Sequence, residues 1–204
     1  MKKSLGPQTI ILPAPVLVVG TYNEDGRPNA MTAAWGGICC SRPPCLAVSL
    51  RKATVTWGNI IRRQAFTVSI PSAAHAAQAD FFGLVSGRDR DKIAEAGLTA
   101  VRSGRVDAPY IEEFPLVISC RVLHSVVLGL HTQFVGEILD VACEETFLDG
   151  KDLPRVEAVD PICYAPGIRE YYGLGKRLGE GYRLGRGLAG GSGDFAAEAQ
   201  VEAG

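Results

Sequence analysis

The chain from Asn29 to Asn59 reads NAMTAAWGGICCSRPPCLAVSLRKATVTWGN. Its first part, Asn29–Trp35, has the spacing of a strand but carries polar side chains where a buried strand is usually apolar. A second strand-like segment ends in Ser49-Leu50-Arg51-Lys52-Ala53-Thr54, with two cations and a hydroxyl. This combination suits a flat heteroaromatic ligand that carries a phosphate.

Strands flank this stretch on its N-terminal side. Val16–Tyr22 is β-branched and apolar, which predicts a strand. The Asp25-Gly26 pair that follows is a hairpin turn signal, so Asn29–Trp35 should return as the partner strand. Thr54–Gln64 has helical spacing, and Thr54 is a plausible N-cap.

The rest of the chain predicts more strands than helices. Strands are expected at Leu46–Leu50, Phe66–Ile70, Leu116–Leu128 and Thr132–Val141, with Pro161–Tyr172 returning to the body, and short helices at Ala73–Phe82 and Asp89–Ala96. The βαβ alternation is absent, and no Gly-x-Gly-x-x-Gly follows a strand. We therefore predict a mainly β fold, an antiparallel barrel with peripheral helices.

The composition is that of one globular domain. The chain has 204 residues, of which 47% are hydrophobic and 21% charged, with a net charge of −1. This charge gives no electrostatic case for nucleic acid or an anionic membrane. The N-terminus lacks an apolar signal region and no window is long enough to span a membrane, so we expect a cytoplasmic protein. We expect the domain to cover residues 1–178, followed by a glycine-rich, flexible tail at 179–204.

The six cysteines do not predict a metal site. There is no Cys-x-x-Cys pair, the chain has three histidines, and adjacent Cys39 and Cys40 are awkward for two tetrahedral ligands. Reduced, mostly buried thiols are the favoured interpretation. A redox dithiol is the minority alternative.

Two segments are candidates for holding a phosphate. Arg51 and Thr54 leave a strand and enter a helix, where a guanidinium fork and free backbone N–H groups could meet an anion. A solvated basic turn with an ordinary helix cap is an equally good interpretation. The second candidate, Ser86–Lys92, has a hydroxyl, cations and Gly87, although on spacing alone a surface loop before a helix is favoured there.

The polar strand and one histidine complete the candidate residues. Asn29 and Thr32 supply polar side chains, and the alanines between them let a backbone approach a flat ring. Met31 is, by composition, more often a core residue than a ring contact. His131 begins a strand; a lone histidine is more often structural, but it is the best single candidate for touching a redox partner or nicotinamide.

These motifs together resemble the flavin-reductase-like FMN-binding split-barrel family over roughly residues 8–178. The likeness rests on Asn29–Trp35, Arg51–Asn59, Phe66–Ile70, Ser86-Gly87 with Asp91-Lys92, His131-x3-Val135-Gly136-Glu137 and Arg169–Gly175. It implies a six-stranded antiparallel split barrel and a homodimer with one FMN per subunit. It implies that the ring is bordered by Asn29, Met31, Thr32 and Ala33, and that the phosphate end is held by Ser49, Leu50, Arg51, Thr54, Ser86 and Lys92. His131 matches the histidine that such reductases place near the nicotinamide.

Two functions of different class follow from the resemblance. The first is an electron-transfer flavoprotein, which takes electrons from a redox protein or NAD(P)H and passes them on, for instance toward sulfite or thiosulfate reduction. The second is an NAD(P)H:flavin oxidoreductase in which His131 helps to position the nicotinamide. A flavin- or haem-storage module is a third, weaker alternative. The alanine and tryptophan form of Asn29–Trp35 favours a retained FMN, and with it the first function.

Overall fold

The computed structural model describes residues 1–88 and 90–188, which fall into two units. The first unit is Met1–Leu174, and the second begins at Gly175. In the second unit, Glu180 forms ion pairs with Arg177 and Arg183 ahead of the short 3-10 helix η3 (Arg186–Leu188). Most of the tail that we expect to be flexible, 179–204, lies outside the described residues.

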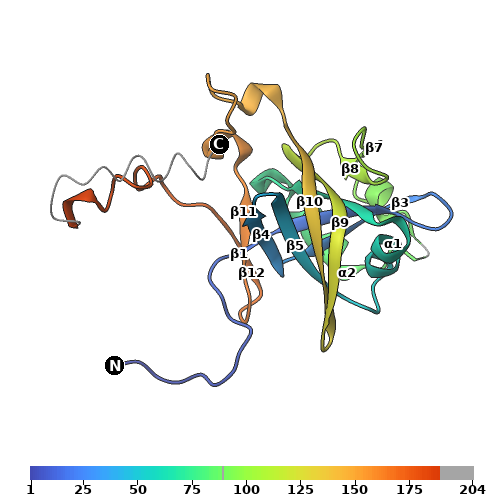
Figure 1. Cartoon of the computed structure of the whole chain (residues 1–204), viewed down its shortest axis with the longest axis horizontal. Coiled ribbons are helices and arrows are strands. Elements are labelled where there is room, and N and C mark those ends of the chain that lie inside the picture. The colour runs from blue at the N-terminus through green and yellow to red at the C-terminus, as the bar shows by residue number, and fades with distance from the viewer. Residues whose placement is uncertain (89, 189–204) are drawn as a thin grey trace. The chain divides into compact units, whose positions relative to one another are not determined.

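A seven-stranded antiparallel sheet forms the body of the first unit (Figure 1). Its strands, in spatial order, are β3 (Pro28–Ala33), β2 (Leu17–Tyr22), β6 (Ala65–Ile70), β9 (Leu116–Leu128), β10 (His131–Cys143), β5 (Pro44–Arg51) and β4 (Gly36–Ser41). The edge strands β3 and β4 are not paired with each other, so the barrel stays open. The predicted mainly β, antiparallel fold is confirmed, with seven strands in this sheet where six were expected.

Smaller elements surround this sheet. Two further sheets pair β1 (Ala14–Pro15) with β11 (Ile162–Ala165) and β12 (Glu170–Gly173), and β7 (Ala100–Arg102) with β8 (Pro109–Ile111). The helices are α1 (Val55–Arg63), α2 (Ala76–Leu84), α3 (Lys92–Glu95) and α4 (Val156–Val159), with 3-10 turns η1 (Ala73–His75) and η2 (Glu145–Phe147). Among the described residues, no helix is long and apolar enough to cross a membrane.

The alternation of β2 and β3 builds two hydrophobic cores. Leu17 and Val19 of β2 pack into the core on one face of the sheet, with Phe66 and Phe134. Val18 packs into the core on the other face, which α2 and α3 cover. Because successive strand residues point to opposite faces, one apolar strand contributes to both cores.

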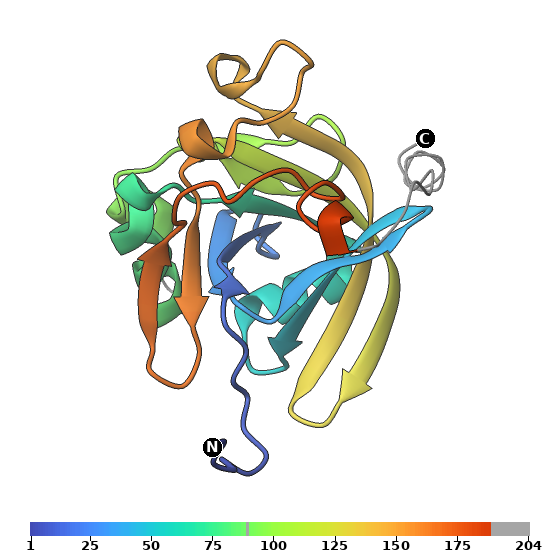
Figure 2. The ribbon, with the colours of Figure 1, turned by 90° about the vertical axis from the view of Figure 1, so that its left-hand side faces the viewer.

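At its turn, the long hairpin β9–β10 extends beyond β6 (Figures 1 and 2), whereas β5 stays paired with β10 as far as His131. β9 pairs with β6 only as far as Arg121, whereas its pairing with β10 continues to Leu128. The end of the hairpin is therefore exposed and carries apolar side chains, with Val127 at 76% and Leu130 at 64% exposure.

The differences from the sequence prediction have local causes. Strand β4 was not expected because Gly36-Gly37 reads as a chain break and four of its six residues are exposed. β7 and β8 are three residues each, too short for a periodic signal. The helix expected over Asp89–Ala96 begins at Lys92, capped by the Asp91 carboxylate on Ala94 N at 3.1 Å, and Asp89 lies outside the described residues.

Candidate functional site

A cavity of about 210 Å³ lies between β3, the N-terminus of α1 and the segment that connects α2 to α3. We call it the Asn29 cavity. Five of the predicted site residues line it: Asn29, Met31, Thr54, Ser86 and Lys92. The fold thus brings together residues from the two segments that the sequence analysis gave as phosphate candidates.

Asn29 brings an unpaired acceptor to this cavity. Its side chain is 1% exposed, and its Nδ2 donates to Thr56 Oγ1 at 2.9 Å. Its Oδ1 is buried and finds no hydrogen-bond donor among the described residues. Because an unsatisfied buried acceptor costs about 1–3 kcal/mol, this oxygen is suited to a donor from a bound molecule.

A polar network fixes the loop that faces Asn29. Asn59 Nδ2 donates to Thr21 Oγ1 at 3.1 Å and to Asn23 Oδ1 at 2.9 Å, and Asn23 Nδ2 donates to the Gly87 carbonyl at 3.3 Å. A Cβ on Gly87 would lie 2.0 Å from Asn29 Oδ1, so only glycine allows this close approach. Sequence analysis did not identify Asn23 or Asn59 as site residues. The one available signal was the position of Asn23 beside the hairpin turn and of Asn59 in helix α1.

Lys92 is a buried cation. Its side chain is 3% exposed, and its Nζ donates to the carbonyls of Phe82 at 3.0 Å and Val85 at 2.9 Å. Burial lowers its pKa to about 8. No carboxylate of the described chain pairs with it, and an ammonium has three donors, so one donor remains for an anion.

The N-terminus of α1 faces the same cavity. Thr54 Oγ1 accepts from Trp57 N at 3.2 Å, which confirms the predicted N-cap. The residues Ala53–Thr56 line the cavity at the start of a nine-residue helix. The first backbone N–H groups of a helix and its dipole favour negative charge at this point.

The other predicted residues lie elsewhere. Ala33 and Leu50 belong to the hydrophobic core, and the Thr32 hydroxyl donates to the Ala79 carbonyl of α2. Arg51 is paired in register with His131, and Ser49 with Gln133, on the neighbouring strands β5 and β10. Directly opposed residues share a face, so we call Ser49, Arg51, His131 and Gln133 the Arg51–His131 face. None of these four lines the Asn29 cavity.

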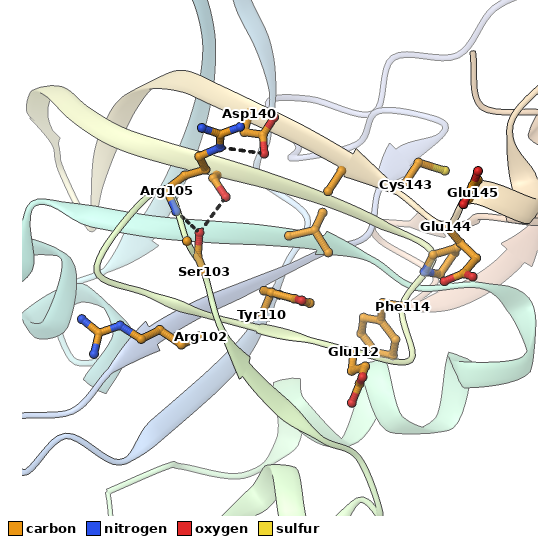
Figure 3. Close-up of a pocket in the computed structure, with 15 residues that line it drawn as sticks. Arg102, Ser103, Arg105, Tyr110, Glu112, Phe114, Asp140, Cys143, Glu144 and Glu145 are labelled. Atoms are coloured by element: carbon orange, nitrogen blue, oxygen red, sulfur yellow. Dashed lines mark hydrogen bonds and ion pairs between the residues drawn. The ribbon is translucent and has the colours of Figure 1, made fainter. Parts of the chain in front are cut away.

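A second cleft, of about 580 Å³, lies between β7–β8 and β9–β10 (Figure 3). Some of its polar groups pair with one another: Ser103 Oγ meets Ser119 Oγ at 3.1 Å, and Arg105 pairs with Asp140 at 3.3 Å. No predicted site residue lines it. The Asn29 cavity is therefore the better candidate site.

Comparison with known proteins identifies the family to which this architecture belongs. The family model described as "Flavin reductase like domain" matches residues 10–167. The chain belongs to this family. Most of the residues that carried the resemblance in the sequence lie on strands and helices, whereas Lys52–Thr54 and Ser86-Gly87 lie in turns or loops.

Two solved structures and one curated relative are similar to this chain in sequence, and the two structures also in fold. The flavoredoxin of Desulfovibrio vulgaris (Miyazaki F) is 50% identical, with a TM-score of 0.88 over 91% of this chain and 100% of that one. The flavoredoxin from Methanosarcina acetivorans is 27% identical, with a TM-score of 0.85 over 92% of this chain and 100% of that one. An uncharacterised protein of Archaeoglobus fulgidus is 35% identical over 61% of this chain and 71% of its own length.

The family and the donor set of the cavity are compatible with the same kind of group. A flavin-reductase-like fold supports a flavin cofactor. The Lys92 ammonium, the α1 N-terminus and the unpaired Asn29 Oδ1 supply a cation, free N–H groups and a buried acceptor. A hydroxyl-bearing, phosphorylated flavin has the complementary groups, so the residues present fit it.

Proposed function

We propose that the protein is an FMN-binding electron-transfer flavoprotein, which receives electrons from a redox protein or NAD(P)H and passes them to an acceptor. The observation that carries this proposal is the Asn29 cavity, where a buried lysine and an unpaired buried acceptor meet at a helix N-terminus. Half identity to a flavoredoxin over 91% of the chain supports it. FMN, when bound, supplies the redox chemistry.

The residues of the cavity would hold the cofactor in two ways. Lys92, Ser86 and the N-terminus of α1 would bind the phosphate end through charge-assisted hydrogen bonds. Asn29 and Met31, with the backbone of β3 at Thr32 and Ala33, would border the ring. The Asn23 side chain donates a hydrogen bond to the Gly87 carbonyl, which would fix this side of the cavity before the cofactor binds.

Ser49, Leu50 and Arg51 are proposed as a second contribution to the phosphate end. Arg51 is exposed and Ser49 half-buried, and both belong to the Arg51–His131 face. Leu50 is 2% exposed within the core, so its contribution would be through its backbone.

One observation favours NAD(P)H:flavin oxidoreductase activity as a second candidate function. Arg51 and His131 lie opposite each other on β5 and β10 and present a guanidinium and an imidazole on one face. These groups are suited to an anionic dinucleotide. In this function His131 would position the nicotinamide.

The absorption spectrum of the protein as purified tests the first claim. A retained FMN gives a yellow protein, whereas a colourless protein that refuses reconstitution with FMN would refute the proposal. Anaerobic stopped-flow titration with NADH and NADPH then separates the two functions. Rapid direct bleaching that slows in His131→Ala favours the reductase, and reduction only through a redox protein favours the carrier.

We also propose a homodimer, for which the exposed end of the β9–β10 hairpin is the candidate surface. Val127, Leu128 and Leu130 are 76%, 53% and 64% exposed at this end. Exposed apolar patches of this kind mark association surfaces. Sedimentation should show a dimer that Val127→Asp weakens, whereas Leu153→Asp, at a position 59% exposed elsewhere, should leave it unchanged. A monomeric parent protein would contradict the proposal.

A further inference from the structure

Three cysteines gather at one end of the sheet, on the β4–β5 hairpin. Cys40 of β4 and Cys45 of β5 are direct cross-strand partners, and Cys39 lies at the irregularity in β4 between Ile38 and Cys40. Directly opposed side chains share a face and have Cβ atoms about 4.5–5.5 Å apart. This spacing is close to that of a disulfide, which needs Cα atoms about 4.4–6.8 Å apart.

The two thiols are held toward the same turn. Cys40 Sγ donates to the Arg42 carbonyl and Cys45 Sγ to the Pro43 carbonyl, each at 3.3 Å. Four residues, Ser41–Pro44, separate the two cysteines along the chain. The turn therefore already brings both sulfur atoms to one end of the hairpin.

The two thiols differ in exposure, so they would take different steps in thiol–disulfide exchange. Cys40 is exposed, whereas Cys45 is 3% exposed. Burial, together with the neighbouring Cys40 and Cys39, raises the pKa of the Cys45 thiol. A small disulfide can reach Cys40 first, and Cys45 is placed to react only from inside the hairpin.

We propose that Cys40 and Cys45 form a reversible dithiol/disulfide couple that exchanges two electrons with small disulfides. The Cys40 thiolate attacks one sulfur of the small disulfide, which forms a mixed disulfide and expels one thiolate. The Cys45 thiolate then attacks the Cys40 sulfur, which forms the Cys40–Cys45 bond and expels the second thiolate. The two protons from the cysteines go to the two released thiolates, so the dithiol is oxidised and the small disulfide is reduced.

This couple is distinct from the proposed flavin site and does not depend on it. The disulfide would close a loop of only a few residues, which gives the low end of disulfide stabilisation, so small thiols can reduce it again. Cys120 is poorly placed for such exchange. Cys120 is fully buried, and burial raises its pKa to about 12.

Exchange with glutathione disulfide tests the couple in the full-length protein. The experiment uses Cys39→Ser as the parent, so that Cys39 cannot take part. Peptide mapping could not exclude Cys39, because Arg27 and Arg42 both precede proline and trypsin would leave all three cysteines in one peptide. After acid quenching and alkylation, intact mass should show two thiols lost and no glutathione retained. Excess reduced glutathione should restore both thiols.

Two further variants assign the residues. Adding Cys45→Ala should trap one glutathione on Cys40, since the second step has no attacking thiol. Adding Cys40→Ser should prevent both the thiol loss and the adduct. A parent that keeps a glutathione adduct, that loses no thiols, or whose thiol loss survives Cys45→Ala would overturn the proposal. Thermal melting of each variant checks that the hairpin still folds.

Discussion

The Asn29 cavity and the Arg51–His131 face differ in how their polar groups are held. In the cavity, Lys92 and Asn29 are 3% and 1% exposed, and their partners are backbone carbonyls and hydroxyls of fixed elements. On the Arg51–His131 face, Arg51 is exposed and projects from the end of a strand. A group that is already desolvated and fixed loses little entropy on binding, whereas an exposed arginine must be ordered.

Substitution of Lys92 should have the largest effect. Lys92→Met removes a buried charge from the phosphate end, and a hydrogen bond to a charged group contributes about 1.5–3 kcal/mol. We expect FMN affinity, measured by fluorescence titration, to fall about 10- to 100-fold, with riboflavin affected much less. Equal losses for both flavins would mean that Lys92 acts only by capping α2.

Substitution of Gly87, which closely approaches Asn29, should have the next largest effect. Gly87→Ala would place a Cβ 2.0 Å from Asn29 Oδ1, so it should lower the free energy of unfolding by about 1–3 kcal/mol and impair flavin binding. Gly83→Ala is the matched control in the same segment. Its Cβ would meet Thr32 Cβ at an ordinary 3.7 Å within α2, so it should be neutral or stabilising in urea denaturation. Similar losses in both variants would argue against the close contact.

Because of the lowered pKa of Lys92, the stability of the unliganded protein and its affinity for FMN should change with pH in opposite directions. Burial lowers this pKa from 10.5 to about 8, so the unfolded chain binds more protons between these values. The unliganded protein should therefore gain stability as pH rises through that window. FMN affinity should fall above pH 8, by at most about tenfold per pH unit, as the ammonium is lost. Lys92→Met should flatten the affinity profile, and a profile unchanged by this substitution would remove Lys92 from the phosphate site.

Arg51 should give the smallest effect on affinity. Arg51→Ala removes an exposed cation, and exposed pairs contribute about 0.2–1 kcal/mol, so FMN affinity should fall a few-fold and riboflavin affinity less. The measurement is the same fluorescence titration at low and moderate salt. A loss as large as that of Lys92→Met would reverse the comparison and make the Arg51–His131 face the principal phosphate contact.

Much of the fold could be predicted from the sequence because its signals are local. The Asp25-Gly26 turn, the β-branched, apolar run of Val16–Tyr22 and the Thr54 cap each specify their own element. Strand β4 was missed because its residues are mostly exposed and it follows two glycines. It forms through pairing with β5, which is a tertiary interaction.

Five of the residues that line the candidate site could be named one by one from the sequence, but their grouping in one cavity could not be predicted. Asn29, Thr54 and the Ser86–Lys92 segment lie far apart in the sequence, and their meeting depends on the path from α2 to α3. Sequence spacing favoured a surface loop at Ser86–Lys92, whereas Gly87 and Lys92 are buried. Lys92 is buried with its Nζ donating to the carbonyls of Phe82 and Val85, and no local sequence pattern indicates these contacts.

The walls of the Asn29 cavity are formed by the edge strand β3, the N-terminus of α1 and the loop between α2 and α3. These segments are widely separated in the sequence. Any molecule that binds among them joins these segments in the folded state and not in the unfolded chain. By mass action, a ligand at one hundred times its Kd adds about 2.7 kcal/mol to the free energy of unfolding. The cofactor would therefore act as a folding determinant, and its cellular supply would set how much of the protein survives proteolysis.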